Sequence, residues 1–248
     1  MAEINSYGGA VRSDIARRTG CTAVLAFDDV TSTMDVAHQQ AESGAASGTL
    51  IVAETQSAGR GREGKKWESD RGGVFLTYLS RNPGIDAAQV LSIRVGLALR
   101  AALEPFSDTR LVLKWPNDIF AGDGKVAGVL AETRWRAGAP EWTAIGIGIN
   151  LVAPEGVANA AGLNANTAHL DVLLKVVPRI REAAEAVGAL SREEVQEYMQ
   201  HDMLRGKRVS KPGSGVVVGI SEEGELVISN DDGIQTARSG HVVIAEDE

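Results

Sequence analysis

Residues 59–67 carry the strongest signal in this sequence: Gly59-Arg60-Gly61-Arg62-Glu63-Gly64-Lys65-Lys66-Trp67. They match the G-x-G-x-x-G pattern of dinucleotide-binding folds, and they miss the G-x-x-x-x-G-K-[ST] pattern of P-loops only at Lys66. Both folds need a helix directly after the loop, because its first N–H groups bind the phosphate. The residues that follow read WESDRGG, and two consecutive glycines do not open a stable helix. Both folds are therefore excluded, and so is a protein kinase, because the sequence has neither an HRD nor a DFG tripeptide.

The loop still has the composition of a ligand-binding segment. Four cations, Arg60, Arg62, Lys65 and Lys66, stand among glycines that let the backbone approach a ligand closely, and Trp67 follows them. Such a set suits a ligand that carries phosphate and a flat ring. Two alternatives remain open at this point, a solvated basic loop without a role and a patch that binds nucleic acid.

The composition of the whole chain limits the classes of protein. Its 248 residues, 44% hydrophobic and 23% charged, are typical of a globular chain with one sizeable domain and a small appendage. Lys and Arg number 25 against 33 Asp and Glu, so the net charge of -8 disfavours a role that is mainly DNA binding. The single cysteine and the widely spaced histidines predict a reducing compartment without structural zinc. No run approaches the roughly 18 apolar residues of a membrane span, and we expect a cytoplasmic protein without a membrane partner.

Strand and helix patterns flank the loop on both sides. A helix is expected after the hydroxyl cluster Thr31, Ser32 and Thr33, which offers N-caps, and a largely buried helix is expected at 86–103. Short turns after residue 111 indicate an antiparallel meander. The sequence therefore predicts an α+β fold with a mixed or antiparallel sheet and packed helices. Apolar runs place its strands at 23–27, 50–53, 74–79, 111–114, 126–133 and 143–151.

The C-terminal part of the chain has a different sequence pattern. Apolar residues at 170–180 keep helical spacing, although Pro178 is expected to kink or split that helix. Ser191 and Glu194 form a capping box for a further helix that ends near Gly206. The rest alternates glycine turns with short β-branched runs, which predicts a small β-barrel and two domains, 1–205 and 206–248. These runs are 216–220, 226–228, 234–237 and 241–244.

Four further strings surround the glycine-rich loop: DVTSTM at 29–34, KWPND at 114–118, KVAGVLAE at 125–132 and GIGIN at 146–150. Together with the loop, in this order and spacing, they resemble the biotin protein ligases, which attach biotin to a lysine of biotin-dependent carboxylases. The resemblance runs from about residue 23 to the C-terminus. It implies a class II synthetase-like catalytic domain and a C-terminal SH3-like barrel. It also implies biotin, ATP and Mg²⁺ at the site and a biotin carboxyl carrier domain as the partner.

The implied reaction joins biotin to ATP as biotinyl-5′-AMP, releases pyrophosphate, and then transfers biotin to the acceptor lysine. Its first step brings a carboxylate to the α-phosphate, and two such charges about 4 Å apart repel by about 4 kcal/mol at an effective dielectric of about 20. A cation is needed between them. The resemblance assigns this role to Lys125, with Arg60 and Arg62 as further catalytic residues and Lys65 beside the phosphates.

The resemblance also implies a ligand-binding set. The ureido ring of biotin has one carbonyl acceptor and two N–H donors, which Ser32, Thr33 and Gln56 can match. Trp67 is expected to cover the ligand as a lid, and Asp118 is the candidate for Mg²⁺, which usually takes one or two carboxylates from the protein. Plainer roles stay open: Ser32 and Thr33 as helix caps, and Asp118 as a turn residue. The resemblance also places the amides of Asn117 and Asn150 at the nucleotide. The full implied binding set is Ser32, Thr33, Gln56, Gly59, Arg60, Gly61, Arg62, Lys65, Trp67, Asn117, Lys125, Gly128, Gly148 and Asn150.

Two residues depart from the family pattern. Met34 stands where Asn is frequent, which puts one polar contact near the ureido ring in doubt, and Glu63 lowers the positive charge of the loop. The segment before residue 23 is too short for a winged-helix domain, so we expect a ligase without repressor function and without DNA as a partner. Two other classes stay open, a lipoate or octanoyl ligase-type modifier of carrier proteins and a non-catalytic binding module.

Overall fold

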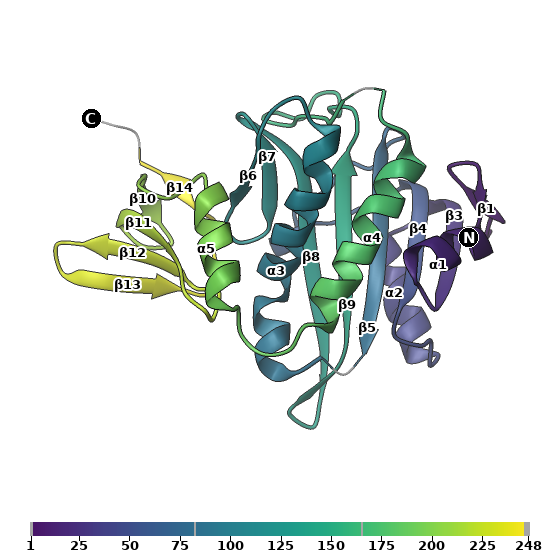
Figure 1. Cartoon of the computed structure of the whole chain (residues 1–248), viewed down its shortest axis with the longest axis horizontal. Helices are drawn as coiled ribbons and strands as arrows, with labels where there is room; N and C mark the ends of the chain where they lie inside the picture. The colour runs from purple at the N-terminus through teal and green to yellow at the C-terminus, as the bar shows by residue number, and fades with distance from the viewer. Residues whose placement is uncertain (1, 82, 165, 246–248) are drawn as a thin grey trace.

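The computed structural model describes residues 2–81, 83–164 and 166–245 (Figure 1). Its centre is a seven-stranded sheet with the strand order β3-β4-β5-β9-β8-β7-β6. β3 and β4 run parallel and the other neighbours are antiparallel, which confirms the predicted mixed sheet. The strands are β3 (Ala23–Val30), β4 (Thr49–Gln56), β5 (Gly73–Arg81), β6 (Leu111–Lys114), β7 (Asp118–Ala121), β8 (Gly124–Arg136) and β9 (Ala139–Asn150).

Helices cover both faces of this sheet. α3 (Ile85–Leu103) and α4 (His169–Glu185) lie in front of it, and α2 (Thr33–Glu42) lies behind it (Figure 1). Side chains alternate along β4 accordingly: Leu50 and Val52 belong to the core that α3 and α4 share, whereas Ile51 and Ala53 belong to a second core with residues of α2. Burial on both faces explains why these strands read as continuous apolar runs in the sequence.

α2 connects the parallel strands β3 and β4. Ser32 is its N-cap and accepts a hydrogen bond from the backbone N–H of Met34 (3.3 Å), as the hydroxyl cluster predicts. β3 ends at Val30 and β4 at Gln56, so the first turn of α2 lies at the carboxyl ends of both strands. In α/β sheets this edge is where ligands commonly bind.

The helix that contains Pro178 is not split. α4 continues through this residue to Glu185, and residues such as Val172, Val176 and Ile180 are fully buried in the main core. α4 also packs against α3 and β5. Burial of this face offsets the hydrogen bond that proline removes, so packing overrides the local preference.

The N-terminal segment carries elements that the sequence patterns did not predict. They are β1 (Ser6–Tyr7), β2 (Ala10–Val11) and α1 (Arg12–Thr19). The backbone N–H of Ile4 donates to the carbonyl of Ala26 (2.8 Å), so this segment lies along the outer edge of β3.

The C-terminal region begins with α5 (Arg192–His201), which opens with the predicted capping box of Ser191 and Glu194. α5 ends earlier than expected because the chain turns at Asp202, and the N–H of Met203 donates to the carbonyl of Leu113 on β6 (2.9 Å). Five antiparallel strands follow, paired in the order β13-β12-β11-β10-β14. They are β10 (Arg208–Lys211), β11 (Gly215–Ile220), β12 (Leu226–Asn230), β13 (Gly233–Ala237) and β14 (Val243–Ile244).

This C-terminal sheet is open. Within the described ranges no pairing joins its edge strands β13 and β14, so the closed SH3-like barrel that we expected is not confirmed. The indole Nε1 of Trp115 donates to the carbonyl of Gly224 (2.9 Å), which ties the C-terminal sheet to the β6 end of the main sheet. Trp115 is buried, as expected for a core residue. Among the helices of the described ranges, none is long and apolar enough to cross a membrane.

Candidate functional site

One cavity of about 500 Å³ gathers the predicted site residues. This volume lies within the range of small-molecule sites. Its walls come from the start of α2, the glycine-rich loop, and strands β8 and β9, with a contribution from Gly240, His241 and Val242 of the C-terminal region. Every residue of the predicted binding set, and Asp118, lines this cavity except Gly59.

One end of the cavity is neutral and held by hydrogen bonds. Gln56 Oε1 accepts from both the backbone N–H of Thr33 (2.8 Å) and its hydroxyl (3.1 Å), which brings the end of β4 to the start of α2. Ser32 and Thr33 are buried, with 1% and 3% of their surface exposed. Ser32 Oγ caps α2, yet its own proton is not used in that contact. The plain role as a cap and a role in ligand binding are therefore compatible in Ser32.

The glycine-rich loop folds back on itself. Arg60 and Lys66 form a β-bridge around a short 3₁₀ turn (Arg62–Gly64), and the N–H of Trp67 donates to the carbonyl of Gly59 (2.9 Å). Glu63 has a positive φ of 57°, a conformation that costs a residue with a side chain some free energy. The departure at Glu63 therefore lies at the tip of this turn.

Trp67 lies on a floor made of two glycines. Gly128 of β8 and Gly148 of β9 are direct cross-strand partners, and a Cβ at Gly148 would come within 2.4 Å of the indole ring. Lys125 Nζ is 5.0 Å from the centre of the same ring, a cation–π distance. The indole Nε1 is buried and has no hydrogen-bond partner among the described residues. Both glycines are thus explained by the space that the indole needs.

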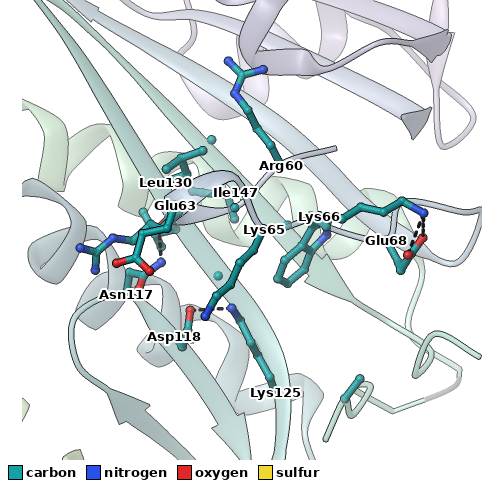
Figure 2. A pocket seen from close by; sticks show the side chains of 18 of the residues that line it. Arg60, Glu63, Lys65, Lys66, Glu68, Asn117, Asp118, Lys125, Leu130 and Ile147 are labelled. Atoms are coloured by element: carbon teal, nitrogen blue, oxygen red, sulfur yellow. Dashed lines mark hydrogen bonds and ion pairs between the residues drawn. The ribbon is translucent and has the colours of Figure 1, made fainter. Parts of the chain in front are cut away.

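The other end of the cavity is cationic (Figure 2). Lys125 Nζ lies 2.6 Å from Asp118 Oδ1, and Lys65 extends toward the same pair from the glycine-rich loop. Within the described ranges Arg62, Lys65 and Lys114 have no acidic partner within salt-bridge distance. Burial lowers the pKa of Lys114, and Lys125 lowers it further while Asp118 acts in the opposite direction. In the part of the chain that the structure describes, the four cations of this end, Arg62, Lys65, Lys114 and Lys125, outnumber its two carboxylates, Asp118 and Glu63, so it suits an anionic ligand.

Arg60 points away from that cationic group (Figure 2). Its guanidinium lies 2.5 Å from Asp35 and makes two hydrogen bonds of 3.1 Å to Glu132. His38 Nε2 lies 2.8 Å from Glu132, and Trp142 Nε1 donates to His38 Nδ1 (3.2 Å), so Nε2 carries the proton that Glu132 accepts. These contacts hold the pKa of Glu132 at about 2, first through His38 and then through Arg60. The Arg60 side chain anchors the first residues of the loop to α2 and β8.

The two predicted amides hold the backbone of β8 in place. Asn117 Nδ2 donates to the carbonyl of Val129 (2.7 Å), and Asn150 Nδ2 donates to the carbonyl of Lys125 (3.2 Å). Both side chains line the cavity, and the hydrogen bonds leave their Oδ1 atoms for a ligand. Their nucleotide contact stays a prediction.

Several residues at the site had no role in the sequence analysis. Lys114 belongs to the KWPND string and Glu132 ends the KVAGVLAE string, so both could have been found from their charge, whereas His38 and His241 gave no local signal. Burial lowers the pKa of His241, followed by the nearby Lys65 and Lys114. Met34, the other departure, is buried, and its Sδ would come within 2.5 Å of a Cβ at Gly146. Met34 therefore packs against the sheet, at the position where the sequence put a polar contact with the ureido ring in doubt.

A comparison with known families bears on this site. The model of the family described as the biotin/lipoate A/B protein ligase family matches residues 24–150, about half of the chain. The chain belongs to this family. The matched residues include all predicted site residues and the strands of the main sheet, except the first residue of β3.

Individual relatives agree with the family. The chain is 29% identical over 239 residues to the biotin--[acetyl-CoA-carboxylase] ligase of Mycobacterium tuberculosis, covering 89% of this chain and 82% of that relative. It is 29% identical over 223 residues to the bifunctional ligase/repressor BirA of Escherichia coli, covering 82% of this chain and 68% of BirA. Among solved structures, the biotin protein ligase of Aquifex aeolicus in complex with biotin and ATP aligns with a TM-score of 0.72 and 29% identity, covering 91% of this chain and all of that one.

Proposed function

We propose that this chain is a biotin protein ligase, which activates biotin with MgATP to biotinyl-5′-AMP and transfers biotin to a lysine of a biotin carboxyl carrier domain. The observation that carries the proposal is the division of one cavity into a neutral, hydrogen-bonding end and a cationic end. Biotin and ATP need such a division, because the ureido ring is neutral and the reacting groups are anions. The relatives named as biotin ligases support the same function.

The first step of the reaction takes place at the cationic end. The biotin carboxylate attacks the α-phosphorus, an oxygen–phosphorus bond forms, and the bond to pyrophosphate breaks. Lys125 is our candidate for the cation between the two anions, with Arg62 and Lys65 on the carboxylate and phosphates. The orientation of Arg60 favours a supporting role through the loop over direct contact with the phosphates.

Trp67 is our candidate for the wall that covers the apolar tail and the adenylate. Its ring already lies inside the cavity, where an aromatic surface can pack against an apolar chain or a flat ring. Asn117 and Asn150 are proposed contacts of the nucleotide. In the second step the amine of the acceptor lysine attacks the acyl carbon, and AMP leaves with the electrons of the broken carbon–oxygen bond.

The residues fit a magnesium ion that arrives with ATP. In the described ranges no group of three or more acidic, histidine or cysteine side chains could hold a metal alone, so most ligands have to come from phosphate oxygens and water. Asp118 is the proposed protein ligand, because it is the carboxylate beside Lys125. Bound there, magnesium would neutralise charge on the phosphates and on the leaving pyrophosphate.

The proposal also covers the domain division, the partner and the location of the protein. We propose that residues 1–205 are the catalytic domain and that residues 206–248 are a small β domain related to SH3-like barrels. The carrier domain of a carboxylase is the proposed partner, which the relatives named as acetyl-CoA-carboxylase ligases support. The need for ATP supports a cytoplasmic location.

Biotin-dependent exchange of labelled pyrophosphate into ATP tests this function. We expect exchange with biotin and none above background with lipoate or octanoate. A preference for lipoate or octanoate would instead support a lipoate-type ligase of the same family. No exchange with any acid would support a non-catalytic binding module and contradict the proposal.

A further inference from the structure

The neutral end of the cavity is supported by two buried hydroxyls outside the predicted binding set. Thr77 of β5 is fully buried and donates from Oγ1 to Thr33 Oγ1 (2.8 Å). Ser69, 3% exposed, accepts from Gln56 Nε2 (2.9 Å) and donates from Oγ to the carbonyl of Trp67 (3.2 Å). Together these contacts form a chain of hydrogen bonds from the sheet core to the glycine-rich loop.

The direction of this chain follows from one fixed donor. The backbone N–H of Thr33 can only donate, so the amide oxygen of Gln56 must face it and the amide nitrogen must face Ser69. Ser69 Oγ therefore accepts from Gln56, and its proton goes to the Trp67 carbonyl. Every hydrogen bond on this side has one orientation.

The hydrogen bonds that link Gln56, Thr33 and Thr77 also have a fixed direction. Gln56 Oε1 can only accept, so the hydroxyl of Thr33 donates to it. Thr33 Oγ1 must then accept from Thr77, whose own hydroxyl is the donor. Because Thr77 has no exposed surface, no bulk water contacts it to compete for this hydrogen bond.

The groups that remain free have a defined polarity. Thr33 Oγ1 keeps one lone pair, and Gln56 Nε2 keeps one hydrogen, so this chain of hydrogen bonds offers a ligand one acceptor and one donor, beside the unused proton of Ser32. A cyclic urea carries an N–H donor directly beside a C=O acceptor and can satisfy both. An octanoyl tail or a dithiolane ring can satisfy neither, and leaving buried polar groups unpaired disfavours its binding.

Gly59 makes room for this arrangement. A Cβ at Gly59 would lie 2.4 Å from Ser69 Oγ and 3.1 Å from Gln56 Nε2. Gly59 does not line the cavity, so its place in the predicted binding set is explained by the close approach of these side chains.

We propose that Thr77 and Ser69 are positioning residues for the ureido ring: they terminate a one-directional hydrogen-bond chain and fix which donor and acceptor this end of the cavity offers. The inference rests on the proposed function and adds two residues that act through Thr33 and Gln56. Thr77 lies deep in the sheet and Ser69 lies beside the loop, so they control the same chain from opposite ends.

The test compares hydroxyl removal with hydroxyl retention in the full-length protein. Thr77→Val keeps the shape and removes the hydroxyl, whereas Thr77→Ser keeps the hydroxyl. In biotin-dependent pyrophosphate exchange we expect Thr77→Val to raise the KM for biotin about threefold to tenfold, the effect of one neutral hydrogen bond. The KM for ATP and kcat should stay within about twofold, and Thr77→Ser should restore most of the affinity for biotin.

Ser69→Ala removes the second hydroxyl, which lies outside the sheet core. It therefore tests the same inference even if Thr77→Val does not fold. We expect the same selective rise in the KM for biotin. Ser57→Ala is the matched control, because Ser57 is an exposed hydroxyl next to Gln56 that contacts only the carbonyl of Val30 (3.4 Å). It should behave as the unchanged protein.

The outcomes separate this inference from the proposed function. If the unchanged protein exchanges pyrophosphate with biotin while Thr77→Val and Ser69→Ala keep its KM for biotin, the positioning role is wrong and the function stands. If Thr77→Ser is as impaired as Thr77→Val, packing and not the hydroxyl matters, which also overturns the inference. If the unchanged protein shows no biotin-dependent exchange, the function itself fails.

Discussion

The two ends of the cavity are built in opposite ways. At the neutral end, Thr33, Gln56, Ser69 and Thr77 use most of their hydrogen-bonding groups on one another and leave few for a ligand. At the cationic end, Arg62, Lys65 and Lys114 have no acidic partner within the described ranges. The side chains of the neutral end are therefore hydrogen-bonded to one another without a ligand, whereas the cationic end has cations that are unpaired among the described residues and can bind anions. This difference indicates that selection of the acid and chemistry on its carboxylate are separate tasks of one cavity.

The largest effect is expected at the cationic end, from Lys125→Ala. Losing one well-placed charge contact at the reacting anions costs about 3 kcal/mol, or about a hundredfold in the rate of adenylation. Biotin-dependent pyrophosphate exchange measures this rate, and circular dichroism checks the fold. Near-normal adenylation by Lys125→Ala would show that Lys125 is not needed for this step and would contradict the separate role of the cationic end.

A second prediction concerns the loop that joins the ends. The backbone of residues 59–73 should gain protection from hydrogen exchange when biotin or the adenylate binds, with Trp67 closing over the ligand. Ligand at a hundred times its Kd stabilises the bound state by about 2.7 kcal/mol, so protection of loop amides should rise by up to about a hundredfold. Equal protection in free and liganded protein would show that the loop is not a lid.

Arg62→Gly should loosen the lid without changing the neutral end of the cavity. It removes a charge-assisted contact with the intermediate and adds backbone freedom, and both changes favour the open loop. Biotinyl-5′-AMP should then escape and label lysines of a bystander such as albumin about tenfold more than with the unchanged protein. The variant must first be shown to form adenylate. If it does so and labels the bystander no more than the parent, Arg62 does not retain the intermediate.

The smallest effect is expected at the root of the loop, where Glu132 meets Arg60 and His38. The pKa of Glu132 is lowered from 4.5 to about 2, so its contribution to stability is present above pH 4.5 and is lost as the pH falls toward 2. Because the side chain is 34% exposed, this contribution is at most about 1 kcal/mol. The difference in free energy of unfolding in urea between Glu132→Gln and the unchanged protein should therefore become smaller as the pH falls from 6 to 3. A constant difference across this range would contradict the depressed pKa.

The sequence predicted the elements and residues whose signals are local. The apolar strands, the cap at Ser32 and the box at Ser191 follow from neighbouring residues. The predicted site residues come from the five strings and Gln56, and all but one of them line one cavity. Gly59 is the exception, because its role depends on side chains that only the folded loop brings near it.

Contacts between distant residues could not be predicted in this way. Thr77 lies 44 residues from Thr33, and Glu132 lies 72 residues from Arg60, so no local pattern links them. Pro178 was expected to interrupt its helix, and burial of that helix overrides the preference. Four of the five strands described after residue 207 were predicted, and β10 was not. The way in which the edges of this sheet pair depends on the three-dimensional path of the chain.

The most direct test of the two-ended cavity is a crystal structure of the protein with a non-hydrolysable analogue of biotinyl-5′-AMP. We predict that the ureido ring makes hydrogen bonds with Thr33 and Gln56 and that the linkage between acid and phosphate lies beside Lys125. A ureido ring among the lysines, with the phosphate next to Thr33, would contradict it.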